Sequence, residues 1–244
     1  ACYLRRDGHD VTVVTADPPG EYCSSGNAGM LNDAGCVPQP MPGMVWKVPG
    51  YLSDPLGPLV VRWTYFAKAM PWMLRFLANS NARQAEHASK ALYALIKGTV
   101  PVYEELVNWA GVRELVRRSG YLVAYDSERS YQGDALAWKL RHERGVKTEI
   151  LDAAGIQKLV PQLARHYVRG VHVLDQGYVT NPERLVKSLA AQFQKEGGVI
   201  LQRKVLDIET GEGGARALVT DAGRMPVETL VVCGGVHSGE LSAK

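Results

Sequence analysis

The chain has 244 residues, of which 46% are hydrophobic and 22% charged, and its formal net charge is +3. This length suffices for one globular unit with a core or for two small domains, and the near-neutral charge without a basic cluster argues against nucleic acid as a partner. The four cysteines form no Cys-x-x-Cys pair, so we expect reduced thiols and no zinc site. No run of about 18 apolar residues is present, so we expect no membrane span.

The first patterned segment runs from residue 11 to residue 29. The β-branched residues 11–14 predict a buried strand, and Arg5-Arg6 followed by Gly8 is typical of a helix end. Two prolines and a glycine then lead into the small-residue loop 24–29. Helix, strand and small-residue loop form the second half of a dinucleotide-binding βαβ unit. The first half, a strand with a glycine-rich turn, is not present, so we expect this chain to be a fragment.

Residues 30–60 are rich in proline and glycine, which predicts a loop rather than one long helix. Residues 60–77 are apolar on nearly all sides, and Pro71 is expected to split them into two short helices. Trp63, Trp72 and Phe76 are expected to be mostly buried in the intact protein, since a helix that is apolar all round is usually buried. The alternative is a membrane-surface or partner-docking face, because aromatic and basic side chains also suit an interface.

The middle of the chain mixes helices and strands and contains no glycine-rich phosphate loop. Helical spacing of apolar residues runs from 82 to 109, with a break near Gly98 and Pro101. Strands are predicted at residues 121–125, 149–151 and 171–174, and helices from 132 to 144 and after a capping Asp152. We interpret this block as a substrate or cap domain inserted into a nucleotide-binding domain.

From Asn181 onward helices and strands alternate again. Asn181 and Pro182 predict a helix start, and the helix is expected to end at Gly197. Strands are predicted at residues 199–201, 205–208 and 217–220. A buried strand is predicted at residues 229–233. We expect the strands at residues 11–15, 199–201 and 230–233 to share one domain.

The segment HDVTVVTADPPGEYCSSGNAGML, residues 9–31, resembles the flavin-binding start of the FAD-dependent D-amino acid oxidase superfamily, and within it the bacterial D-amino acid dehydrogenases. The resemblance continues at residues 54–59, 71–77, 177–185 and 231–238, so it covers essentially the whole chain. It implies an α/β fold, a FAD-binding Rossmann-like domain with an inserted α+β substrate domain, incomplete at both ends. The implied domains are residues 1–46 and 178–244 for FAD and residues 47–177 for the substrate.

The resemblance also implies FAD as the cofactor and a set of cofactor-binding residues. These are Thr15, Ala16, Cys23, Ser24, Asn27, Ala28, Gly29, Met30, Val205 and Gly234. By resemblance, Cys23 and Ser24 lie near the pyrophosphate, residues 28–30 lie against the flavin ring, and the backbone of Val205 pairs with the adenine.

The end of the first strand departs from the usual pattern. A dinucleotide strand usually ends in Asp or Glu, whose carboxylate accepts hydrogen bonds from the ribose hydroxyls. Thr15 occupies this position and can accept one such bond without charge. Asp17 is an alternative ribose ligand, and a purely structural role for Thr15 also stays open.

The implied activity is oxidation of the amine of a D-amino acid, or a similar small amino acid, by hydride transfer to flavin, with quinone or oxygen as the electron acceptor. The location implied is cytoplasmic, with peripheral contact to the inner face of the plasma membrane as an option. A non-catalytic remnant of the same fold and an NAD-dependent dehydrogenase are the alternatives.

No catalytic residue is identified: the arginine that holds the substrate carboxylate is expected beyond Lys244, and spacing does not choose among Arg62, Arg129 and Arg169. The fragment alone is expected to be inactive.

Overall fold

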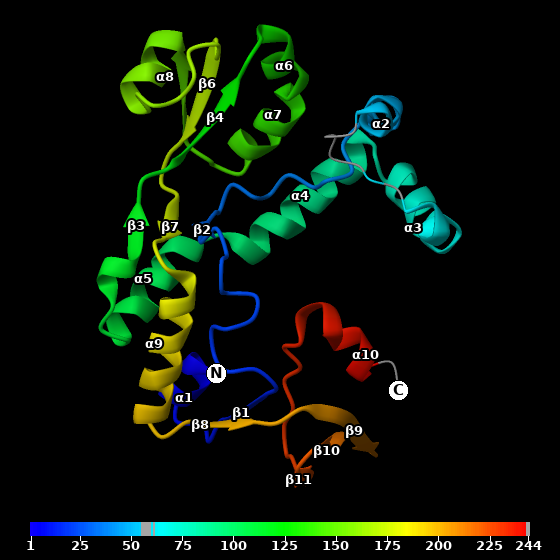
Figure 1. The fold of residues 1–244 in the computed structure, drawn as a ribbon, viewed down its shortest axis with the longest axis vertical. Coiled ribbons are helices and arrows are strands. Elements are labelled where there is room, and N and C mark those ends of the chain that lie inside the picture. The colour runs from blue at the N-terminus through cyan, green and yellow to red at the C-terminus, as the bar shows by residue number, and fades with distance from the viewer. Residues whose placement is uncertain (55–59, 61, 243–244) are drawn as a thin grey trace. The chain divides into compact units, whose positions relative to one another are not determined.

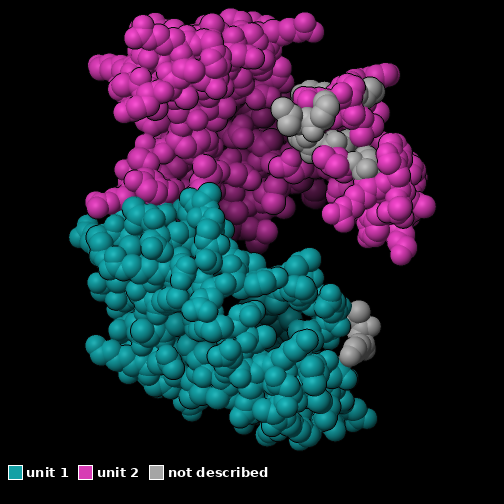
Figure 2. All heavy atoms as spheres, viewed as in Figure 1, with its two compact units in different colours: residues 1–29, 104–116, 179–244 teal, residues 30–103, 117–178 magenta. Residues whose placement is uncertain are grey.

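The computed structural model describes residues 1–54, 60 and 62–242. Residues 55–59, which carry part of the family resemblance and of the proline-rich stretch, lie outside the described residues, as do Val61 and the last two residues. The chain divides into two compact units (Figure 2): unit 1 is residues 1–29, 104–116 and 179–244, and unit 2 is residues 30–103 and 117–178. These bounds differ from those of the predicted domains, which as functional domains stay a prediction.

Unit 1 contains a parallel pair of strands and an antiparallel three-stranded sheet (Figure 1). The parallel pair is β1 (Thr12–Thr15) with β8 (Val199–Gln202), in the register Thr12↔Val199 to Thr15↔Gln202. The antiparallel sheet has the order β11-β10-β9. Its strands are β9 (Val205–Gly211), β10 (Gly214–Thr220) and β11 (Gly223–Pro226). The strands predicted at residues 199–201, 205–208 and 217–220 are therefore confirmed.

Helix α9 (Pro182–Lys195) leads into β8 and begins as its sequence predicts. The side chain of Asn181 accepts a hydrogen bond from the backbone N–H of Arg184 at 2.9 Å, and Pro182 occupies the first turn, where its missing N–H costs nothing. Leu185 and Phe193 are buried. Gly198 lies against the Phe193 ring, so that a Cβ at Gly198 would come within 2.3 Å of it. The helix is thus fixed by its cap at one end and by apolar packing at the other.

Unit 1 also contains several short elements and the second half, residues 104–109, of a longer helix. The short elements are α1 (Cys2–Arg6), the 3-10 turns η1 (Arg113–Leu115) and η2 (Gly235–His237), and α10 (Ser238–Ser242). The guanidinium of Arg5 donates to the carbonyl of Glu196 at 2.6 Å, which ties α1 to the end of α9.

Unit 2 is built on the antiparallel sheet β4-β6-β5. The strands are β4 (Tyr121–Tyr125), β5 (Thr148–Asp152) and β6 (Arg169–Val173). The helices around it are α6 (Glu128–Gly133), α7 (Ala135–Glu143) and α8 (Ala153–Leu159). Asp152 caps α8 as predicted, accepting from the N–H of Gly155 at 2.8 Å. The predicted single helix at residues 132–144 is two helices, α6 and α7, which meet at Asp134.

The core of unit 2 lies between this sheet and α7. Its buried residues are Ala34, Tyr125, Trp138, Val146, Val171 and Val173. The indole N–H of Trp138 donates to the Tyr125 hydroxyl at 2.8 Å, and that hydroxyl donates to the Asp134 carboxylate at 2.9 Å. The buried polar atoms of this core are therefore paired, which burial requires.

A long-range contact of Asp33 orders the start of helix α5 (Thr99–Trp109), which follows α4 (Ala82–Ile96). The Asp33 carboxylate accepts from the backbone N–H groups of Gly98 and Thr99, at 2.8 and 3.0 Å. The break predicted near Gly98 is confirmed. Just before Asp33, residues 30–31 form the first strand of a small sheet with the order β2-β7-β3. Strand β2 (Met30–Leu31) is antiparallel to β7 (Gly177–Val179), and β3 (Val116–Arg118) is the third strand.

Two further predictions are corrected. The stretch 30–60 is not only a loop, since it contains β2 and α2 (Met44–Ser53). Residues 63–78 form one helix, α3 (Trp63–Ala78), because Pro71 removes a single backbone donor without ending the helix. None of its residues is buried in this chain: Trp63 is 73% exposed, Trp72 is 65% exposed and Phe76 is half-buried. The burial of these aromatics in the intact protein stays a prediction.

The strand predicted at residues 229–233 is also wrong. These residues have no regular secondary structure, and Val231 is 64% exposed. A strand needs a neighbour for its backbone hydrogen bonds. Within the described residues β1 pairs with β8 alone, and residues 229–233 pair with neither.

Candidate functional site

The carboxyl ends of β1 and β8 meet at one edge of the parallel pair in unit 1. Thr15 lies opposite Gln202, and the carbonyl of Thr15 accepts from the N–H of Arg203 at 2.8 Å. Val205 begins β9 a short step further along the chain. The structure therefore brings Thr15, Ala16 and the approach to Val205 to one edge, where ligands of parallel α/β sheets bind.

Thr15 is half-buried and its hydroxyl is already oriented. The Thr15 Oγ donates to the carbonyl of Asp17 at 3.0 Å, which leaves its oxygen lone pairs to accept a hydrogen bond from a ligand. The neighbouring Ala16 is exposed, and its carbonyl accepts from the Gln202 side chain at 3.2 Å. A hydroxyl acceptor beside a small exposed residue fits one hydroxyl of a ribose, without the charged grip of a carboxylate.

The end of the small-residue loop is held by a close approach of two backbones. Gly29 is buried, with φ at +68°, and a Cβ there would lie 2.3 Å from the carbonyl oxygen of Val179. The same two residues are joined by a hydrogen bond from the N–H of Val179 to the carbonyl of Gly29, at 2.7 Å. The Asn27 side chain accepts from the N–H of Gly29 at 2.8 Å. Gly29 is therefore required by geometry, and the Asn27 oxygen shapes the loop.

The small-residue loop is the last part of a longer loop, residues 16–29, which follows β1. The first part of this longer loop is held against the first turns of α9. A Cβ on Gly20 would meet the carbonyl oxygen of Glu183 at 2.8 Å, and the Ser25 hydroxyl donates to the Glu183 carboxylate at 3.1 Å. Lys187 bridges Glu183 at 2.7 Å and Glu21 at 3.1 Å. The hydrogen bond from Lys187, followed by that from Ser25, lowers the pKa of Glu183, while the same Glu183 contact raises the pKa of Lys187. These contacts position the loop between its two glycines.

Within this loop the predicted ligand residues lie at the surface. Cys23 and Ala28 are exposed and Ser24 is half-buried. Small side chains on a fixed backbone allow a flat or phosphorylated group to approach, which fits the predicted use of this segment.

Two predicted residues lie elsewhere. Met30 belongs to unit 2, where it is 55% exposed and pairs with Tyr178. Gly234 is exposed and precedes η2 after the irregular segment that replaces the predicted strand.

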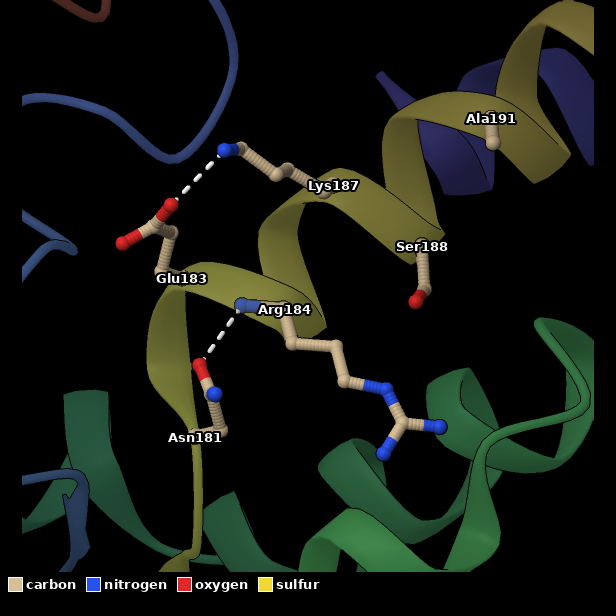
Figure 3. A pocket seen from close by; sticks show the side chains of 6 residues that line it. All are labelled: Asn181, Glu183, Arg184, Lys187, Ser188 and Ala191. Atoms are coloured by element: carbon tan, nitrogen blue, oxygen red, sulfur yellow. Dashed lines mark hydrogen bonds and ion pairs between the residues drawn. The ribbon is translucent and has the colours of Figure 1, made fainter.

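An open hollow of about 410 Å³ lies along α9, and its charged groups are already paired. It is lined by Asn181, Glu183, Arg184, Lys187, Ser188 and Ala191 (Figure 3). The Arg184 guanidinium contacts Glu114 at 2.6 Å, and Lys187 is engaged as described. The hollow therefore offers no unpaired charge for a substrate.

The three arginines among which spacing did not choose have different surroundings. The Nε of Arg169 donates to Glu128 at 2.8 Å, and its guanidinium lies 5.8 Å from the centre of the Tyr131 ring, so Arg169 is already neutralised. Arg62 is exposed at the start of α3 and Arg129 is exposed in α6. None is held in a site by its neighbours.

Gln202 and Arg203 are residues that sequence reasoning missed. They lie beside Ala16 and Thr15 through the Gln202 side chain and the Arg203 N–H. The available signal was the parallel pairing of two predicted strands, which brings the residues after each strand to the same edge. Across the described part of the chain, no cluster of three or more His, Cys, Asp or Glu residues could hold a metal ion, and no helix is long and apolar enough to span a bilayer.

The chain is similar to known proteins over its whole length. The family model described as DAO, FAD dependent oxidoreductase, matches residues 1–244. A D-amino-acid oxidase of Bradyrhizobium diazoefficiens is 34% identical over 241 residues, covering 98% of this chain and 57% of the relative. A D-amino acid dehydrogenase of Rhizobium johnstonii is 27% identical over 246 residues, covering 98% and 58%.

Among solved structures, the glycine oxidase of Geobacillus kaustophilus matches with a TM-score of 0.65 at 19% identity, covering 99% of this chain and 53% of that protein. This likeness shows the fold and confirms the predicted fold class. The chain thus spans a little more than half the length of the relatives it matches.

Proposed function

The chain belongs to the family of FAD-dependent oxidoreductases, and on that premise we propose that the whole protein oxidises the amine of a D-amino acid. The product is an imino acid, which hydrolyses to a keto acid and ammonia. The observation that carries the proposal is the match along residues 1–244, together with a relative of 34% identity whose name is D-amino-acid oxidase. The family assignment favours flavin over the NAD-dependent alternative.

In this proposal the carboxyl edge of β1 and the loop of residues 16–29 hold the cofactor. The hydroxyl of Thr15 accepts a hydrogen bond from the adenosine ribose beside Ala16. The loop contributes its backbone and small side chains, and we assign the following residues of unit 1 to the cofactor: Cys23, Ser24, Asn27, Ala28 and Gly29, with Val205 and Gly234 from the second half. The assignment of Met30 stays a prediction from the resemblance. FAD, when bound, supplies the hydride acceptor.

The contribution of the protein is binding and orientation. The loop is held by Gly20 and Gly29 at its two ends, so its backbone is preorganised before a ligand arrives. No side chain in the described residues is assigned as an acid or a base. Glycine, sarcosine and hydroxyproline are the alternative small substrates, and both quinone and oxygen suit the proposal as acceptors.

The absorption spectrum of the purified full-length protein tests this proposal. We expect the visible bands of oxidised flavin, and we expect these bands to bleach under anaerobic conditions with D-amino acids and not with their L-enantiomers. A colourless protein that takes up no FAD would instead support the non-catalytic alternative. Bleaching by sarcosine or glycine alone would keep the flavin assignment and replace the substrate.

A further inference from the structure

Helix α3 exposes an unusual number of aromatic side chains. The helix has 16 residues, of which none is buried. Trp63 is 73% exposed, Trp72 65% and Tyr65 59%, and Trp46 in the preceding helix α2 is 85% exposed. Large apolar side chains gathered on one exposed element mark an interaction surface, whereas single exposed ones need no explanation.

Four of the exposed side chains share one face of α3. Tyr65, Lys68, Trp72 and Arg75 are spaced by three, four and three residues, which places them in a row along the helix. All four are exposed. We call this row the aromatic–basic face. The half-buried residues Phe66, Met73 and Leu77 lie on the other side of the helix.

The sequence that contains this face carries only positive charge. Between Asp54 and Glu86 the sequence contains no acidic residue, while Arg62, Lys68, Arg75 and Arg83 are basic. In the part of the chain that the structure describes, Lys68 and Arg75 form no ion pair. The two cations are therefore available to an external negative charge.

We propose that the aromatic–basic face binds the surface of an anionic lipid bilayer, with α3 lying in the plane of the interface. Tryptophan and tyrosine partition to the headgroup region, where one part of the ring is apolar and the other is wet. Lysine and arginine add attraction to anionic lipids. With 16 residues, α3 is shorter than the roughly 20 residues of a membrane-spanning helix, which fits a surface position.

A second copy of this chain fits the face less well than lipid does. A two-fold contact would place the same face on both sides, and Lys68 and Arg75 would then meet their own like charges. An anionic surface instead offers complementary charge along the whole row. The inference does not rest on the proposed oxidation, because it uses no residue of the candidate flavin site.

Vesicle sedimentation with the full-length protein tests the proposal. We expect binding to vesicles of phosphatidylcholine and phosphatidylglycerol in equal parts, release by added salt, and little binding to phosphatidylcholine alone. Each basic residue near the surface contributes roughly a fivefold gain in partitioning. The variant Lys68→Glu, Arg75→Glu should therefore bind at least about 25-fold more weakly. The control variant Lys158→Glu, Arg165→Glu makes the same charge change on exposed residues of unit 2 and should bind as the wild type does.

Tryptophan fluorescence provides a second measurement, which reports contact between the aromatic ring and the acyl chains rather than electrostatic attraction alone. We expect vesicles with brominated acyl chains to quench the emission, and we expect Trp72→Phe to reduce this quenching while the buried Trp138 continues to report a folded core. Equal binding to neutral vesicles, or equal loss in the control variant, would overturn the proposal. Self-association in the absence of lipid that Lys68→Glu, Arg75→Glu abolishes would assign the face to a second copy. Protection of Trp72 from an aqueous quencher without vesicles would show that the rest of the protein covers the aromatic–basic face, and would also overturn the proposal.

Discussion

The loop at residues 16–29 in unit 1 and the sheet core of unit 2 are held in different ways. The core is apolar, with Val173 fully buried and Trp138 5% exposed, and its few polar groups bond to one another. The loop is largely exposed and is held by ion pairs, hydrogen bonds and two close approaches of glycine to backbone carbonyls. A core of this kind sets the stability of its unit, while a loop of this kind sets the position of a few backbone groups that a ligand can meet.

The largest effect is expected from Trp138→Ala, which removes the largest side chain of the core. Truncating a buried tryptophan costs about 3–5 kcal/mol of unfolding free energy. It also leaves the Tyr125 hydroxyl without its donor. Urea unfolding followed by circular dichroism measures the loss. If the core sets stability and the loop sets cofactor binding, the variant that remains folded should bind FAD with unchanged affinity. A loss of FAD affinity in the folded variant that accompanies the loss of unfolding free energy would contradict this division of roles.

Gly29→Ala should be the most damaging change within the loop. Its Cβ would lie 2.3 Å from the Val179 carbonyl, so the backbone must move and the 2.7 Å hydrogen bond between these residues is lost. We expect a loss of about 3 kcal/mol, which combines left-handed strain of about 1–2 kcal/mol with the lost contact.

Gly26→Ala is the matched control for this change. Gly26 has φ at +70°, close to the +68° of Gly29, but nothing lies within 4 Å of the position of its Cβ. It should cost only the strain, about 1–2 kcal/mol. Equal losses in the two variants, measured by urea unfolding, would show that the approach to Val179 is unimportant.

The next effect concerns pH and the core of unit 2. Burial, with the nearby Asp134 carboxylate adding to it, raises the pKa of Tyr125 to about 12, above the usual value near 10. Because the pKa is raised in the folded state, the stabilisation is complete below about pH 10 and is lost as the pH rises toward 12. The loss should reach about 2–3 kcal/mol. Comparison with Tyr125→Phe isolates the contribution of the Tyr125 hydroxyl. The variant should lose less unfolding free energy between pH 10 and pH 12 than the wild type does. The same dependence of unfolding free energy on pH in both proteins would show that Tyr125 is not responsible for the loss.

Local sequence signals predicted much of the fold. The caps Asn181 and Asp152 and the break near Gly98 depend on a few neighbouring residues, and the structure confirms all three. The strands β4 and β8 follow from short apolar runs for the same reason.

Features that depend on distant partners were predicted less well. The apolar pattern of α3 indicated a buried helix, but burial needs a neighbour that the pattern does not specify. Residues 229–233 have the composition of a strand without a strand beside them. The capping of α5 by Asp33, which lies 65 residues before Gly98, has no local signal at all.

The candidate site divides along the same line. The small residues of the loop pointed to close backbone approach, which Gly29 shows in the structure. The positions of Gln202 and Arg203 beside Ala16 and Thr15 required the register of β1 with β8. The role of Thr15 at a ribose rests on family resemblance together with its place at that edge, and it therefore needs a direct test.

Titration of the full-length apoprotein with FAD, followed by flavin fluorescence, tests that role most directly in Thr15→Glu. A carboxylate at this edge would accept both ribose hydroxyls, and the added charge-assisted hydrogen bond is worth about 1.5–3 kcal/mol. We therefore expect FAD to bind roughly ten- to a hundredfold more tightly. Thr12→Glu adds the same charge on the exposed start of β1, away from the carboxyl edge, and should leave the affinity unchanged. Weaker binding in Thr15→Glu, or equal tightening in both variants, would contradict the placement of the FAD ribose at the carboxyl edge of β1.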